Sequence, residues 1–291
     1  MKKMFMAVIA LMMTISASAQ FYIYCSDGNV IKVDSISMVA PGEPEQPNPS
    51  AGIGVFSVSA DKQVTFSKGN LQYTQSTNIW SFAENQYDYL GEANIAIDAD
   101  VLADKVDLFG WSTSTTNFGV STSTSDSDYS GSFVDWGTNK IGNDAPNTWR
   151  TLSKDEWEYL LTNRTNAYEL NGVAQVNGIN GLILLPDNWT CPAGVTFKSG
   201  GDWRVDVDYA AHQTFTAEQW TKLEAVGAVF LPASGNRYGS TVNKVQDFGY
   251  YWSASDCYDY FAHYLDIGSY GANRSNYDRC FGYSVRLVKD L

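Results

Sequence analysis

The sequence predicts an α+β fold with a mixed or antiparallel sheet and two main helices. Apolar and polar residues alternate over many short stretches, glycines separate these stretches, and only two segments carry the start signals and apolar spacing of a helix. The first predicted pair of strands is Val55–Val58 and Gln63–Phe66, with Ala60 and Asp61 in the turn between them. Few helices among many short strands favour an α+β domain over a helical bundle.

Both predicted helices begin with a capping box, in which a hydroxyl and a carboxylate or amide three residues later satisfy backbone N–H groups. In the first, Ser153 and Glu156 precede the apolar residues Trp157, Leu160 and Leu161. In the second, Thr216 and Gln219 form the capping box. Apolar Trp220, Leu223 and Val226 follow, and Gly227 supplies a stop.

Four short stretches are candidates for buried strands, and one long polar run predicts a surface loop. Ser112–Ser132 consists almost entirely of serine, threonine, asparagine, aspartate and glycine, so it lacks the apolar residues needed to fold alone. The buried-strand candidates are Leu182–Leu185, Ala228–Leu231, Tyr250–Ser253 and Ser284–Val288.

The first fifty residues predict export and a separate N-terminal segment. Residues 1–19 have a charged start, an apolar run and a small-residue end, as in a cleaved signal peptide. Residues 20–39 read as a β-hairpin around Asp27-Gly28-Asn29, and residues 40–50 carry four prolines, as in a semi-rigid linker. Residues 51–291 then form the main domain. We expect a location in the periplasm, on the outer surface or in the medium, and no later run long enough to span a membrane.

Charge and cysteine content narrow the possible partners. The net charge is −13, and removal of Lys2 and Lys3 with a signal peptide makes it more negative, so nucleic acid is not an expected partner. The cysteines at 25, 191, 257 and 280 follow no small disulfide-scaffold spacing. A Cys257–Cys280 disulfide and two free thiols both remain open.

Several motifs, taken in order, carry a resemblance to a known superfamily. Trp149–Tyr159 resembles a signature of the formylglycine-generating-enzyme and sulfatase-modifying superfamily, which builds on a C-type-lectin-like fold. Phe230–Arg237, Gly249–Ser255 and Ser284–Val288 resemble Fibrobacter-type major paralogous domain proteins and variable proteins of diversity-generating retroelements from Bacteroides-type bacteria. The likeness covers roughly residues 55–288. It implies a C-type-lectin-like binding domain that presents its C-terminal region, residues 253–288.

This resemblance divides the C-terminal region into scaffold and presented positions. The expected scaffold positions are Trp252, Ala262, Leu265, Gly282 and Arg286. The expected ligand-binding residues are Asp256, Cys257, Tyr258, Asp259, Tyr260, Phe261, His263, Tyr264, Ser269, Tyr270, Asn273, Ser275, Asn276, Tyr277, Asp278 and Phe281.

The composition of this region suits recognition. Tyrosine offers a large contact area with few rotatable bonds, and Asn, Ser and Asp adapt their hydrogen bonding, as in antibody paratopes. Ser253–Val288 also lacks Lys, Glu, Gln, Met and Trp, the residues that adenine-directed retroelement mutagenesis of AAY codons cannot produce. The serine-rich stretch Ser112–Asp135 lacks all five as well, so low complexity is a competing explanation. Some of these tyrosines could equally pack inward as strand residues.

The sequence carries no recognisable catalytic or metal pattern. Cys257 and Cys280 are too far apart to match the closely spaced cysteine pair of the superfamily's oxidising enzymes. His212 and His263 are remote from each other and lack nearby acidic or cysteine ligands at zinc spacing. Glu156 and Glu158 are explained by helix capping and a solvated helix face. We therefore expect no enzyme activity, no cofactor and no metal site.

Three function hypotheses follow. The first is an exported, non-catalytic receptor-like or adhesin-like protein, with a C-terminal region open to diversification by a retroelement; its ligand would be a protein or glycan on another cell or phage surface. The second is a structural or adhesin subunit of a surface assembly, joined through the N-terminal hairpin and linker. The third is an enzyme of the sulfatase-modifying superfamily whose acidic residues form no recognisable pair in the sequence.

Overall fold

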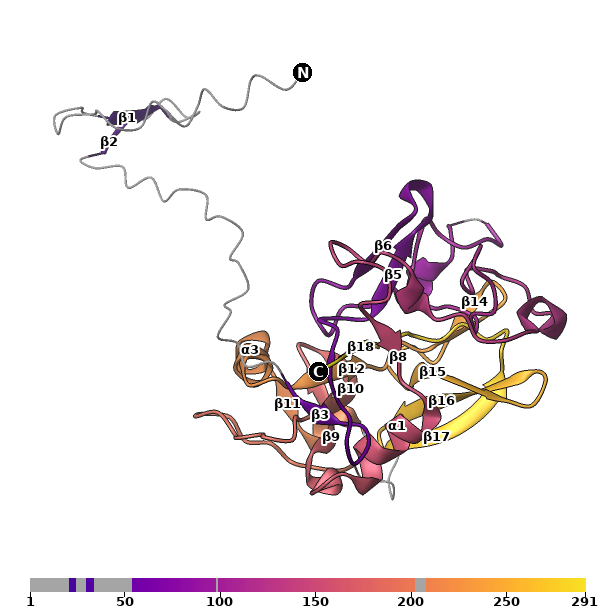
Figure 1. Ribbon diagram of the computed structural model, residues 1–291. Helices are drawn as coiled ribbons and strands as arrows, with labels where there is room; N and C mark the ends of the chain where they lie inside the picture. Colours follow the sequence, from indigo (N-terminus) through magenta and orange to yellow (C-terminus); the bar gives the residue numbers. More distant parts are fainter. Residues whose placement is uncertain (1–20, 25–29, 34–53, 98, 202–207) are drawn as a thin grey trace. The chain divides into compact units, whose positions relative to one another are not determined.

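The computed structural model describes residues 21–24, 30–33, 54–97, 99–201 and 208–291 (Figure 1). The chain divides into two compact units, Met1–Pro49 and Ser50–Leu291. In the first unit, β1 (Phe21–Tyr24) and β2 (Val30–Val33) form an antiparallel pair. The predicted signal peptide, the hairpin turn, Cys25 and the 40–50 linker lie outside the described residues.

The second unit is a mixed α+β domain, mostly strands in several small sheets with few helices, as predicted. One four-stranded sheet has the order β3-β4-β18-β8, and β18 pairs antiparallel with both β4 and β8. β3 and β4 form the antiparallel pair predicted from the alternating residues. The unit's first and last strands therefore share one sheet. Their bounds are β3 (Phe56–Ser57), β4 (Gln63–Phe66), β8 (Arg150–Thr151) and β18 (Leu287–Asp290).

The second four-stranded sheet, in the order β11-β9-β10-β12, is mixed. β10 pairs antiparallel with β9 and β12, whereas β11 runs parallel to β9. Two of the predicted buried strands, Leu182–Leu185 and Ala228–Leu231, overlap β10 and β12. The second is within one residue at both ends, whereas β10 begins three residues before its predicted start and ends one residue before its predicted end. The bounds are β9 (Asn171–Val176), β10 (Ile179–Leu184), β11 (Thr214–Phe215) and β12 (Val229–Pro232).

Two smaller sheets, β6-β5-β7 and β13-β14, lie toward the upper right of Figure 1. The 3-10 turn η2 (Gln75–Thr77) connects β5 to β6. The predicted strand Ser284–Val288 is wrong at its start: β18 begins at Leu287, and Ser284 forms only an isolated bridge with Tyr251. The bounds are β5 (Leu71–Thr74), β6 (Ile79–Phe82), β7 (Lys105–Val106), β13 (Asn236–Tyr238) and β14 (Thr241–Asn243).

Both predicted capping boxes are present. Ser153 caps α1 (Lys154–Glu158), which continues into the π-helical turn η6 (Tyr159–Asn163), and Thr216 caps α3 (Ala217–Ala225). A third, short helix, α2 (Tyr209–His212), carries no capping box and was not predicted. The 3-10 turns are η3 (Gly91–Asn94), η4 (Asp126–Tyr129), η5 (Trp136–Thr138) and η7 (Ala167–Glu169).

The serine-rich stretch Ser112–Ser132 contains no strand within the described residues, as predicted, but it is not solvated throughout. Ser112 and Tyr129 are buried, and the Trp136 indole N–H donates to the Phe118 carbonyl at 2.8 Å. Buried aromatic residues on both sides therefore anchor this loop. The sequence does not predict this anchoring, because Phe118, Val120 and Tyr129 are too few among the polar residues to form a periodic pattern.

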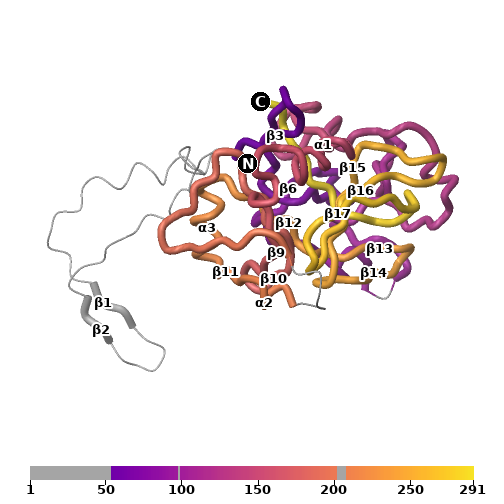
Figure 2. Tube along the Cα trace, turned by 90° about the horizontal axis from the view of Figure 1, so that it is seen from below, coloured from indigo at the N-terminus to yellow at the C-terminus, as the bar shows by residue number. Residues whose placement is uncertain are grey.

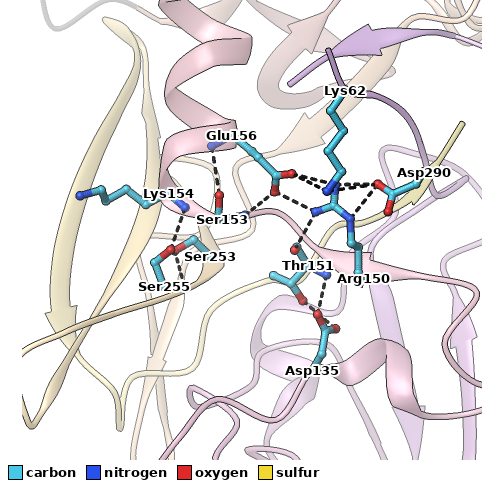
Figure 3. Close-up of polar contacts among 10 residues, drawn as sticks. All are labelled: Lys62, Asp135, Arg150, Thr151, Ser153, Lys154, Glu156, Ser253, Ser255 and Asp290. Atoms are coloured by element: carbon cyan, nitrogen blue, oxygen red, sulfur yellow. Dashed lines mark hydrogen bonds and ion pairs between the residues drawn. The ribbon is translucent and has the colours of Figure 1, made fainter. Parts of the chain in front are cut away.

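Glu156 ties the start of α1 to both ends of the second unit (Figure 3). Its carboxylate accepts from the Ser153 N–H, forms a bidentate pair with Arg150, both contacts at 2.8 Å, and lies 3.2 Å from Lys62. Arg150 also pairs with Asp290 in β18. Burial alone would raise the pKa of Glu156, but these partners hold the pKa below its ordinary value.

We predict that Glu156→Gln lowers the free energy of unfolding at neutral pH by about 2 kcal/mol, because the guanidinium of Arg150 loses the more buried of its two charged partners. Because the pKa of Glu156 is lower in the folded than in the unfolded state, its ionised carboxylate stabilises the fold at pH values above the unfolded pKa of about 4. This stabilisation is lost as the pH falls through the pKa of the folded state. The difference between the two proteins in urea unfolding should therefore shrink on acidification. Asp155→Asn, at an exposed carboxylate on the same helix turn, should change stability little. An equal loss in both variants would contradict this role.

Candidate functional site

The C-terminal region forms a three-stranded antiparallel sheet, β15-β16-β17, which is yellow to orange in Figure 2. Its strands are β15 (Gly249–Cys257), β16 (Phe261–Gly268) and β17 (Gly271–Asp278). Trp252 lies opposite Tyr264, and Tyr264 lies opposite Ser275. A register shift between Trp252 and Asp256 bends β15 toward its tip.

One face of this sheet packs on α1 and the main core. Leu265 and Ile267 of β16 and Tyr251 of β15 are fully buried in the cluster that also contains Trp157 of α1. The Lys154 N–H donates to the Ser255 hydroxyl at 3.1 Å, and Arg274 of β17 forms an ion pair with Glu158 (Figure 3 shows the Lys154 contact). Glu158 is therefore a partner of the C-terminal sheet rather than part of a solvated helix face.

The opposite face carries a continuous row of aromatic rings. The rings of Tyr250 and Tyr283 stack with centroids 5.0 Å apart, and Tyr264 lies 4.9 Å from Tyr283. Phe281 extends the row, with Tyr238 and Tyr277 each 4.8 Å away. Tyr238 and Tyr277 are each 45% exposed, so the outer end of the row is open to solvent while its inner end is buried.

Most of the predicted ligand-binding residues are accessible, with one clear exception. Tyr264 is 9% exposed and packs between Trp252, Tyr250 and Tyr283, so its assignment as a presented residue is wrong. All of the predicted scaffold positions are buried. Exposed residues are Asp256, Tyr258, Asp259, Tyr260, Tyr270, Asn273, Asn276 and Tyr277; partly buried ones are Cys257, Phe261, His263, Ser269, Ser275, Asp278 and Phe281.

These residues do not form one surface. Because side chains alternate between the faces of a sheet, Asn273, Ser275 and Tyr277 share the aromatic face with Tyr264. Phe261, His263, Asn276, Asp278 and Cys257 belong to the face toward α1. Tyr258, Asp259 and Tyr260 form the tip between β15 and β16, and Ser269 and Tyr270 form the turn between β16 and β17.

The tip of the β15–β16 hairpin and the end of the serine-rich loop border an open cavity of about 470 Å³. Its floor is Arg279, whose buried guanidinium lies 4.3 Å from the centre of the Trp111 ring and donates to the carbonyls of Tyr258 and Gly131, each at 3.1 Å. Burial lowers the pKa of Arg279. The guanidinium fixes the backbone of the tip, where Tyr258 has a φ of 57°. The cavity is lined by Ser130, Gly131, Asp256, Tyr258, Asp259, Tyr260 and Arg279.

At the other end of the sheet, Asp266 lies beneath the tyrosines. Tyr270 donates its hydroxyl proton to Asp266 Oδ2, whereas Asp266 Oδ1 is buried without a partner within the described residues. Burial raises the pKa of Asp266 and, together with the Asp266 carboxylate, raises the pKa of Tyr250 to about 12. At neutral pH the Tyr250 hydroxyl therefore remains protonated and can donate a hydrogen bond.

Sequence reasoning missed Tyr238, Tyr250, Asp266 and Arg279. The alternation in Gly249–Ser253 could have shown that Tyr250 faces away from Tyr251. Tyr238 comes from β13, far along the chain, and no local pattern connects it to Phe281. Arg279 carries no sequence signal for its position above Trp111.

Within the described residues no group of three His, Cys, Asp or Glu side chains is placed to hold a metal ion. Cys191, Cys257 and Cys280 are free thiols, so the Cys257–Cys280 disulfide is not formed. Burial raises the pKa of the Cys280 thiol to about 11, which leaves it protonated and unreactive at neutral pH.

Comparison of the chain with protein-family models, with curated proteins and with solved structures found no match in any of the three. Among the described helices, none is both long and apolar enough to cross a lipid bilayer.

We predict that Tyr264→Ala destabilises the protein by about 3 kcal/mol, because it removes a buried ring from the centre of the aromatic row. Tyr258→Ala, at a side chain that is 84% exposed, should change stability by less than about 0.5 kcal/mol. Thermal and urea unfolding of the two variants provide the measurement. Similar losses for both tyrosines would contradict the division into scaffold and presented residues.

Proposed function

We propose that residues 51–291 form a non-catalytic ligand-binding domain with a C-type-lectin-like fold, exported by an N-terminal signal peptide. The proposal combines the motif order described above with the form of the C-terminal sheet. The partner we propose is a protein or glycan on another cell or phage surface. The strongly acidic charge argues against nucleic acid as that partner.

The observation that carries the proposal is a set of accessible tyrosines on a rigid sheet. Tyr258 and Tyr260, in the turn between β15 and β16, are 84% and 49% exposed, and Tyr277 in β17 is 45% exposed. The central strand β16 is anchored by fully buried Leu265 and Ile267. Large exposed aromatic side chains usually cost solubility unless a partner covers them, and tyrosine combines apolar area with a hydroxyl that orients the partner. A fixed backbone also reduces the entropy lost on binding.

The ligand-contacting surface we propose is narrower than the sequence indicates. It consists of the hairpin tip with Asp256, Tyr258, Asp259 and Tyr260, and the outer aromatic row with Tyr277. The buried Arg279 keeps the tip in one conformation, so aspartates and tyrosines around the tip cavity are presented together. Carboxylates beside aromatic rings suit hydroxyl-rich or cationic groups of a partner.

Diversification of this surface by a retroelement is a separate proposal, supported by the resemblance and by the absence of Lys, Glu, Gln, Met and Trp from Ser253–Val288. Sequencing of the flanking DNA tests it. A reverse transcriptase gene and a near-copy of the 3′ coding segment that differs at adenines would support it, and their absence would remove it.

We predict that fluorescently labelled protein binds a subset of intact bacterial strains and phage particles in a surface panel. The triple variant Tyr258→Ala, Tyr260→Ala, Tyr277→Ala should lose at least about tenfold in affinity, because paratope tyrosines supply most of such a contact. Tyr168→Ala is the matched control, since Tyr168 is 72% exposed in η7, outside the C-terminal sheet. Equal binding by the triple variant and the wild type would refute the proposed surface.

A further inference from the structure

A second cavity, of about 300 Å³, lies between the β5–β6 hairpin and the beginning of the serine-rich loop. It shares no lining residue with the C-terminal sheet. Its lining residues are Tyr73, Gln75, Asn78, Trp80, Thr115, Thr116, Asn117, Phe118, Val120 and Asn139. We propose that this cavity is a binding site for a neutral saccharide, a site that does not depend on the C-terminal surface.

The cavity has an aromatic floor. The rings of Tyr73 and Trp80 lie 4.4 Å apart at a 30° angle, and Phe118 meets Trp80 edge-on at 5.7 Å. Trp80 is 6% exposed, so it is held firmly in the core, while Tyr73 and Phe118 are partly open. The open parts of the Tyr73 and Phe118 rings offer apolar surface against which the C–H face of a sugar ring packs, and Trp80 supports both rings from the core.

Four amide side chains around the rim each have one end fixed by the protein. Gln75 donates to the Ala103 carbonyl and Asn139 to the Trp136 carbonyl, which leaves the amide oxygen of each without a partner among the described residues. Asn78 accepts from the Tyr73 hydroxyl and Asn117 accepts from the Gly119 N–H, and the amide NH₂ of each likewise has no partner in the described ranges. The rim therefore presents both donors and acceptors within the described part of the chain.

This balance fits hydroxyl groups. A sugar hydroxyl donates one hydrogen bond and accepts others, so it pairs with a rim that offers both kinds of group. None of the lining side chains is an acid or a base that is charged at neutral pH. A charged ligand would lose its hydration without gaining a counter-charge, whereas a neutral saccharide loses little.

The loop side of the cavity is built rigidly. Phe118 has a φ of 49°, a left-handed conformation that is unusual for an aromatic residue, and its carbonyl accepts from Trp136. At the next residue, Gly119 has a φ of 78°, and an added Cβ would lie 1.9 Å from the Gly110 carbonyl oxygen. Strained backbone that the surroundings hold in place is typical of sites that are formed before the ligand arrives.

The test titrates the full-length protein with neutral hexasaccharides (maltohexaose, cellohexaose, xylohexaose and mannohexaose) and with anionic trigalacturonate, followed by saturation-transfer NMR and tryptophan fluorescence. We expect at least one neutral probe to bind with a Kd of about 1 mM or tighter. Trigalacturonate should bind more weakly than that probe. Absence of binding by every neutral probe at 10 mM, a concentration about tenfold above this limit, would overturn the proposal.

The matched variants are Asn117→Asp and Asn276→Asp. In the first, the carboxylate still accepts from the Gly119 N–H, but the free amide donor is lost and a charge enters the cavity. We expect about a tenfold loss of saccharide affinity with an unchanged melting temperature. The second makes the same chemical change at an exposed asparagine of β17 and should leave saccharide binding unchanged.

The Tyr258, Tyr260 and Tyr277 triple variant separates this proposal from the proposed function. It should bind the neutral saccharide as the wild type does, whatever happens to cell or phage binding. If it loses saccharide binding while Asn117→Asp retains it, the saccharide site lies on the C-terminal surface and the cavity is not the site.

Discussion

The buried guanidinium of Arg286 connects parts of the domain that come from distant stretches of sequence. Arg286 is 1% exposed and donates to Asn70 Oδ1 and Gln86 Oε1, both neutral amides. Gln86 in turn donates to the Ala228 carbonyl and accepts from the Phe230 N–H, so the same contact reaches β12. Burial lowers the pKa of Arg286 to about 10, which still leaves it charged at neutral pH. The two amide oxygens are the side-chain acceptors of this buried charge among the described residues, so losing either one would be costly.

That constraint determines where the C-terminal sheet lies. Asn70 also donates to the Tyr251 hydroxyl, and Tyr251 donates to the Pro232 carbonyl, so the inner face of β15 is fixed to the same network. Once Tyr251 points inward, strand alternation directs Tyr250 and Trp252 to the other face. The aromatic row, and the exposed tyrosines at its outer end, are therefore consequences of a buried polar network on the far side of the sheet.

The sequence could predict whatever depends on neighbours along the chain. Ser153 with Glu156, and Thr216 with Gln219, identify both capped helices because each capping box is complete within four residues. The resemblance correctly separated buried Trp252 and Leu265 from exposed Tyr258. It also predicted that Tyr264 is presented to a ligand, whereas Tyr264 is buried. Tyr264 shares the aromatic face with Trp252 but is buried there by the rings of Tyr250, Trp252 and Tyr283. It lies opposite Trp252 because of a register shift in β15 that no local sequence pattern marks.

The serine-rich loop shows most clearly why the two cavities could not be predicted from composition. Its beginning lines the β5–β6 cavity through Phe118, and its end lines the tip cavity through Gly131. Between these points Tyr129 fills the space over Gly110, where an added Cβ would lie 2.2 Å from the tyrosine ring. A few aromatic anchors therefore hold a stretch whose remaining residues are hydroxyls and amides. Such residues cannot build a core, and once held in place they provide neutral hydrogen-bonding groups at two separate cavities.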